Sequence, residues 1–171
     1  MHDDETVRVR SALVCLYGAV ASVMRHEVDD ARLLLVDLRD SFEDIDEVLV
    51  AVSLATLERL EAAVGAGPSI APQQGRPIAQ ELLFIAHGYG VARLPAVQSA
   101  AWRLDAIRQG DHEQALADIS TARLRTSDAE LILGAISLLA ATVELWARRT
   151  GQSPSAAIGD LCLAAALDPA A

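Results

Sequence analysis

The segment from Ser127 to Arg149 constrains the fold most, because its helical pattern leaves almost no polar face. Polar or small residues recur along it at spacings of three and four, at Glu130, Gly134, Ser137, Ala141, Glu144 and Arg148. Leu, Ile, Val and Trp occupy most of the positions between them. A helix that is apolar almost all round has to be buried almost all round. We therefore expect this segment to be the axis of an all-helical domain or the contact surface of an oligomer.

A second segment, from Thr6 to about Arg25, repeats this design. Its narrow seam of small and polar residues consists of Arg8, Ser11, Cys15, Gly18, Ser22 and Arg25. We expect the two segments to pack along these seams, against each other or against symmetry mates, and to form the spine of the fold within one chain or across a dimer. A homodimer is the expected state, because two helices this apolar have more surface to bury than a small chain easily covers.

Capping and helix-breaking residues divide the rest of the chain into further helices. Ser41 followed by Asp44 predicts an N-cap for a helix from about Phe42 to Val64, after a shorter helix around Asp30 to Arg39. The other starts are predicted at Ile78, Pro95, Asp111, Ser127 and Ser153. No segment shows the alternation of a strand. The fold class expected is all-α, a compact bundle of seven or eight helices.

The stretch from Gly65 to Pro77 cannot continue a helix, because it contains three prolines and three glycines. We expect a flexible loop or linker at 65–77, between an N-terminal part of three helices and a C-terminal part of five. The N-terminal part is near the lower size limit for a stable core. The chain is therefore expected to form a single all-helical domain over residues 1–171.

The charge of the chain argues against nucleic acid and membrane as partners. Asp and Glu number 24 against 14 basic residues, all of them Arg, for a formal net charge of -10. This charge repels phosphates and anionic lipid. Glu130 and Glu144 keep the uncharged run between them below the roughly 20 residues that a membrane span needs. The acidic N-terminus does not fit a secretory signal, and the bias toward Ala, Gly and Arg is typical of a GC-rich bacterial genome, so a cytoplasmic bacterial protein is expected.

Acidic residues crowd between positions 27 and 47. The candidate patch consists of Asp29, Asp30, Asp37, Asp40, Glu43, Asp44, Asp46 and Glu47. Such a run can be a solvated helix face, or it can be a docking surface for a basic protein partner. Both interpretations stay open.

No motif in the sequence indicates catalysis. Cys-x-x-Cys, His-Glu-x-x-His, Gly-x-Ser-x-Gly and a phosphate-binding loop are all missing. His26 and Asp30 have the i, i+4 spacing of metal ligands, but a third ligand is not identifiable. We therefore expect no catalytic residues, no metal and no cofactor. A pocket could still form from aromatic and imidazole side chains, although such side chains are more often core residues than ligands of a bound molecule: His87, Tyr89, Trp102 and His112.

The run from Gly110 to Ala122 has Gly at a turn, followed by Ala, a bulky residue and Ala. This spacing resembles the second helix of a tetratricopeptide repeat. The resemblance implies one antiparallel helical hairpin over about residues 96–124. The sequence holds no second copy, whereas repeat proteins need about three to bury their faces.

These observations favour recognition over chemistry. The function expected is a protein-protein recognition module without catalytic activity, acting as an adaptor, regulator or inhibitor. The alternative is a small-molecule-binding regulator or enzyme with a pocket in the helical bundle, because bundles build sites from facing side chains without a local motif. An acidic mimic of nucleic acid is a third hypothesis.

Overall fold

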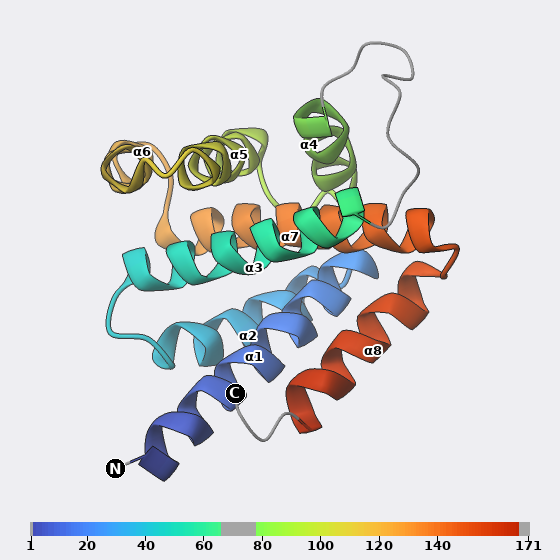
Figure 1. Ribbon diagram of the computed structural model, residues 1–171. Helices are drawn as coiled ribbons and strands as arrows, with labels where there is room; N and C mark the ends of the chain where they lie inside the picture. Colours follow the sequence, from blue (N-terminus) through green and yellow to red (C-terminus); the bar gives the residue numbers. More distant parts are fainter. Residues whose placement is uncertain (1, 66–77, 168–171) are drawn as a thin grey trace.

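The chain forms an all-α bundle, as expected from the sequence (Figure 1). The computed structural model describes residues 2–65 and 78–167, and within these ranges every regular element is a helix. Gly65 ends the third helix, and the rest of the expected loop at 65–77 lies outside the described residues. The described residues form eight helices: α1 (His2–Met24), α2 (Val28–Asp40), α3 (Ile45–Gly65), α4 (Ile78–Gly88), α5 (Leu94–Arg108), α6 (His112–Arg123), α7 (Asp128–Thr150) and α8 (Pro154–Leu167).

The helices are arranged in three layers (Figure 1). Helices α3 and α7 run alongside each other in the middle and share the most extensive contact of the molecule. Helices α4, α5 and α6 cover one side of this pair, and α1, α2 and α8 cover the other. The layers do not follow the expected division at residues 65–77, because α3 packs on α7 and α8 packs on α1.

Helix α7 is buried along its length, as its sequence predicts. Every residue from Leu131 to Val143 is buried, and α7 contacts all seven other helices. Among the described residues it is the one helix long and apolar enough to cross a membrane, but 78% of its apolar window is buried inside the bundle. That burial is typical of the core helix of a soluble protein. A single chain therefore covers this helix without an oligomer.

The predicted start of α7 is confirmed. The Ser127 hydroxyl accepts a hydrogen bond from the Glu130 backbone N–H at 3.3 Å, which satisfies one of the donors left free at a helix N-terminus. Gly151, with φ of 72°, ends the helix in the left-handed conformation that glycine adopts most easily. The predicted cap of α6 is confirmed too, since the Asp111 carboxylate accepts from Gln114 N–H at 3.0 Å.

The start of α3 differs from the prediction. The helix begins at Ile45 instead of Phe42, and Asp44 caps it by accepting from the Glu47 N–H at 2.9 Å. Ser41 instead closes α2, and its hydroxyl donates to the Asp37 carbonyl. Both residues can cap a helix, but only Asp44 is followed three positions later by a Glu, whose carboxylate reaches back to a free N–H of the turn.

The two seams do not face each other within the chain, so the spine of α1 and α7 expected within one chain is wrong. Gly134 of α7 lies under Ala96 of α5: a Cβ at position 134 would come within 2.5 Å of the Ala96 carbonyl group. Gly18 of α1 faces Leu34 of α2, at 3.3 Å from the same hypothetical atom. Helices α1 and α7 do touch, but α1 packs chiefly on α2. Small residues on one helix allow another helix to pack closely against it, but they do not determine which helix that is.

Candidate functional site

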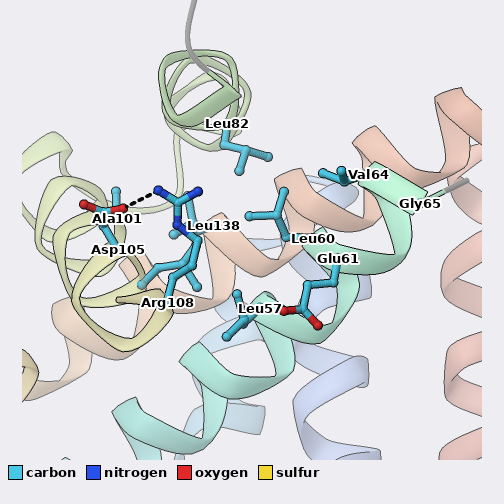
Figure 2. Close-up of a pocket in the computed structure, with 11 residues that line it drawn as sticks. Leu57, Leu60, Glu61, Val64, Gly65, Leu82, Ala101, Asp105, Arg108 and Leu138 are labelled. Atoms are coloured by element: carbon cyan, nitrogen blue, oxygen red, sulfur yellow. Dashed lines mark hydrogen bonds and ion pairs between the residues drawn. The ribbon is translucent and has the colours of Figure 1, made fainter. Parts of the chain in front are cut away.

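An open pocket of about 600 Å³ lies between α3, α4, α5 and α7 (Figure 2). Figure 2 shows the α3 side chains on one side of it, the α5 side chains on the other, and Leu82 projecting from α4. Aliphatic side chains make most of the wall. We call this feature the apolar pocket, defined by Leu57, Leu60, Val64, Leu82, Leu104 and Leu138.

The burial of these side chains gives the apolar pocket a closed floor and an open wall. Leu82, Leu104 and Leu138 are buried beneath it. On the α3 side, Leu57 and Leu60 are half-buried, and Val64 is 48% exposed. Exposed apolar surface that lines a concavity is typical of a binding site.

Charged groups stand only at the rim of the apolar pocket. Arg108 and Asp105, one turn apart on α5, form an ion pair of 2.8 Å (Figure 2). Glu61 of α3 lies on the opposite side and has no ion-pair partner among the described residues. The rim therefore has a net negative charge, like the chain as a whole.

Sequence reasoning did not find the apolar pocket. Leu57, Leu60 and Val64 have the i, i+3, i+7 spacing of one helix face, but this spacing is equally typical of a face buried in the core. The other walls come from helices far away in the sequence. Only the packing of α4 and α5 over α3 leaves that face partly uncovered.

The structure does not bring the four expected pocket residues together. Tyr89 is buried, whereas His87 and His112 are exposed. Trp102 is 65% exposed and lines a different pocket, between α5 and α6. None of the four lines the apolar pocket.

Tyr89 has a structural environment in the connection between α4 and α5. Its hydroxyl donates a hydrogen bond to the Glu144 carboxylate of α7, and Glu144 also pairs with Arg148. Burial, followed by the hydrogen bond and the charge of Glu144, raises the pKa of Tyr89. This network joins a loop to the central helix.

His26 belongs to the same region and has a partner that is not a metal. It adopts a positive φ of 61° just after α1, and its Nδ1 lies 2.8 Å from the Tyr89 carbonyl oxygen. Because a carbonyl only accepts, Nδ1 carries the proton. Within the described part of the chain, no three His, Cys, Asp or Glu residues are grouped as metal ligands, and the pair of His26 and Asp30 gains no third member.

Arg103 of α5 is a buried charge that the sequence did not indicate. It has no exposed surface, its Nε donates to the Ser53 hydroxyl at 3.0 Å, and its Nη1 has no partner among the described residues. Burial lowers the pKa of Arg103 to about 10, and the charge of Asp118 opposes that shift. The groups around Arg103 therefore compensate only in part for the cost of burying its positive charge.

The acidic residues expected as a patch extend from α2 to the start of α3. Seven of the eight are exposed, and Asp46 is half-buried. Three have structural contacts: Asp44 and Glu47 form the cap of α3, and Asp46 lies 3.9 Å from Arg123. The remaining five are Asp29, Asp30, Asp37, Asp40 and Glu43.

Comparison of the chain with known protein families, with characterised proteins and with solved structures finds no match. The function has to be inferred from the residues that line the pockets.

Proposed function

We propose that the chain is a cytoplasmic recognition protein that binds an amphipathic helical segment of a basic partner protein in the apolar pocket. The observation that supports this most is the set of six aliphatic side chains around an open space of about 600 Å³. Grooves of this kind accept the apolar face of a helix, whose side chains enter at positions i, i+3 or i+4, and i+7.

The open side of the pocket favours a partner larger than the pocket itself. A small ligand normally has most of its surface buried by its site. Here the α3 wall includes Val64, which is half exposed, and Gly65, so an occupant of the apolar pocket would extend beyond this open side. A helix that inserts two or three side chains and leaves its polar face in water fits that shape.

The charge of the rim favours basic residues next to the inserted side chains. Asp105 is paired with Arg108, whereas Glu61 has no ion-pair partner in the described part of the chain and could pair with a cationic residue of the partner protein. The net charge of -10 also attracts a cationic segment from a distance, because complementary charge mainly accelerates and selects encounters. The homodimer expected from the sequence belongs to the same proposal, since a dimer would present two such pockets.

A peptide selection tests the proposal. Random peptides of roughly 15 residues, about four helical turns, are displayed on phage and selected against the full-length chain. Enriched sequences should place Leu, Ile or Phe at helical spacing with Lys or Arg between them. Val64→Glu should weaken binding of a synthetic enriched peptide, measured by calorimetry, by about tenfold or more, because it puts a charge into the apolar contact.

Leu54→Glu is the matched control. Leu54 also lies on α3 and is 49% exposed, almost the same as Val64, but it does not line the apolar pocket. This variant should retain the affinity of the wild type, and circular dichroism should show both variants equally helical. Equal affinities of wild type and Val64→Glu, or a selection without a helical apolar pattern, would contradict the proposal.

A small apolar molecule is the second candidate, favoured by the volume of the pocket, which falls within the range of small-ligand sites. Nile red, a neutral apolar dye, serves as the probe. Stoichiometric binding that Val64→Glu abolishes and Leu54→Glu preserves, together with a peptide selection that enriches nothing, would support this candidate over a protein partner.

A further inference from the structure

A second pocket, of about 760 Å³, lies on another side of α5, between α5, α6 and the first residues of α7. Adjacent residues of α5 line the two pockets: Ala101 faces the apolar pocket, and Trp102 lines this one. We call it the Trp102 pocket, defined by Arg93, Ser99, Trp102, Asp118, Arg125 and Glu130. It differs from the apolar pocket in being lined by charged and hydroxyl-bearing side chains.

Trp102 provides a flat apolar surface in the Trp102 pocket. Trp102 is 65% exposed, although tryptophan is highly buried on average in proteins. A tryptophan in this position is available to stack on a ring, since aromatic pairs favour offset stacking. Tryptophans of this kind are enriched at binding sites.

The two arginines of the pocket are free to bind an anion. Arg93 and Arg125 are exposed and have no ion-pair partner among the described residues. The two carboxylates of the lining pair with neither guanidinium among the described residues: Glu130 accepts from the Arg93 backbone N–H at 3.3 Å, and Asp118 accepts from the Gln114 amide at 2.7 Å.

A buried polar group points to a missing partner in this pocket. Ser99 lines it and is only 5% exposed, yet its hydroxyl has no hydrogen bond among the described residues. Unsatisfied buried polar groups are rare in proteins, and a ligand is one cause. The charged lining consists of two arginines and two carboxylates, on a chain of net charge -10. Arg103, one turn after Ser99 on α5, is fully buried and does not line the pocket, but its positive charge interacts favourably with Asp118.

We propose that the Trp102 pocket binds a small aromatic anion, whose ring stacks on Trp102 and whose carboxylate or phosphate group is bound by Arg93 and Arg125. Guanidinium groups form strong, geometrically specific hydrogen bonds with both kinds of anion. The Ser99 hydroxyl supplies a further donor at the buried end of the pocket. This site is separate from the apolar pocket, so it stands independently of the function proposed above.

Fluorescence of Trp102 tests the proposal directly. The chain has two tryptophans, so Trp146→Phe leaves Trp102 as the single reporter. The probes are benzoate and phenyl phosphate, with neutral benzamide and ring-free inorganic phosphate as comparisons. Benzoate or phenyl phosphate should change the Trp102 emission saturably, with a Kd of about a millimolar or tighter for ligands of this size. Benzamide and inorganic phosphate should bind at least about tenfold more weakly.

Variants separate specific binding from general attraction to charge. Arg93→Ala and Arg125→Ala should each weaken the binding of the preferred anion by about tenfold, the effect of losing one charge-assisted hydrogen bond. Arg10→Ala, at an exposed arginine of α1 outside the pocket, should leave it unchanged. Trp102→Ala should abolish binding in ligand-observed NMR, with circular dichroism confirming an intact fold.

Three results would overturn the proposal. The first is the absence of saturable binding for both aromatic anions. The second is that inorganic phosphate or benzamide binds as tightly as the aromatic anions. Tight binding of phosphate would show that the ring is not needed, and tight binding of benzamide would show that the charge is not needed. The third is equal affinity in Arg93→Ala, Arg125→Ala and Arg10→Ala, which would place the anion elsewhere on the surface.

Discussion

Arg103 is fully buried, and among the described residues its guanidinium has a single hydrogen bond, to Ser53. Among the described residues no carboxylate lies within ion-pair distance of it. A buried charge without full compensation costs several kcal/mol, and replacing buried ionic groups with apolar residues of similar size is often neutral or stabilising. Arg103 therefore lowers stability at neutral pH relative to an apolar residue that fills the same space.

Arg103→Met tests this inference. We expect its free energy of unfolding at pH 7, from urea denaturation, to equal that of the wild type or to exceed it by about 1 kcal/mol. Arg103→Ala is the control, because it removes the charge but leaves a cavity, and it should lose about 2 kcal/mol or more. A loss of similar size in Arg103→Met would show that the guanidinium has a stabilising partner.

The difference in stability between the wild type and Arg103→Met should depend on pH. The pKa of Arg103 is lowered to about 10 in the folded state, whereas an unfolded arginine keeps its proton to a higher pH. Between these values the unfolded state binds more protons, so the stability of the wild type rises with pH. The stability of the wild type relative to Arg103→Met should therefore increase as the pH rises through about 10.

Tyr89 has the opposite pH dependence. Tyr89→Phe removes its hydrogen bond to Glu144 and should lower stability at pH 7 by about 1.5 kcal/mol. The pKa of Tyr89 is raised in the folded state, so the unfolded chain loses the tyrosine proton first, at a pH of about 10. The stabilising contribution should be constant below that pH and decrease above it.

Tyr17→Phe is the matched control for Tyr89→Phe. Tyr17 is buried to the same degree, but its hydroxyl has no hydrogen bond among the described residues. This variant should lose less stability at pH 7, measured by urea denaturation. Equal losses would mean that the contact between Tyr89 and Glu144 contributes nothing to stability.

At the scale of the elements, the crossing of α5 over α7 depends on one glycine. A Cβ at Gly134 would meet backbone atoms of Ala96, which cannot rotate away, whereas a Cβ at Gly18 would meet the flexible end of Leu34. Gly134→Ala should therefore lower stability by about 2 kcal/mol or more, and its Tm by roughly 4 to 8 °C. Gly18→Ala should change Tm little, because better helix propensity offsets the contact. Similar calorimetric Tm values for both variants would contradict the close crossing.

The elements that sequence reasoning predicted well are those with local signals. The start of α7 depends on Ser127 and its neighbours, and the burial of α7 follows from its own apolar residues. Where two local signals competed, as at Ser41 and Asp44, the predicted start was wrong by one turn. The partner of each seam could not be predicted, because it depends on how helices cross.

The pockets could not be predicted from the sequence either, because they also depend on how the helices cross. The apolar pocket takes its walls from four helices, and no local pattern shows that the α3 face beside Leu57 and Val64 stays partly uncovered. Trp102 was identified as a pocket residue, but the residues that share its pocket come from the start of α5, from α6, and from the connection to α7 and its first turn, and include none of the expected histidines. The burial of Arg103 runs against the usual exposure of arginine, so the sequence had no signal for it.

At the scale of the whole molecule, a single chain contains both the central helix α7 and the helices that cover it. The sequence argument for a homodimer depended on two apolar helices that a small chain could not cover, but α7 is covered from all sides by helices of the same chain. The dimer stays a prediction, now supported only by exposed aliphatic residues such as Leu33 and Val36 of α2.

The central position of α7 also has a consequence for biosynthesis. Its most extensive partner, α3, ends at Gly65, more than sixty residues before α7 begins at Asp128. The segments of α1 to α6 therefore emerge from the ribosome before α7, the helix that they pack on. Until α7 has been synthesised, their apolar faces are exposed to solvent or bound by chaperones. The core can close only after α7, which ends at Thr150, has left the ribosome.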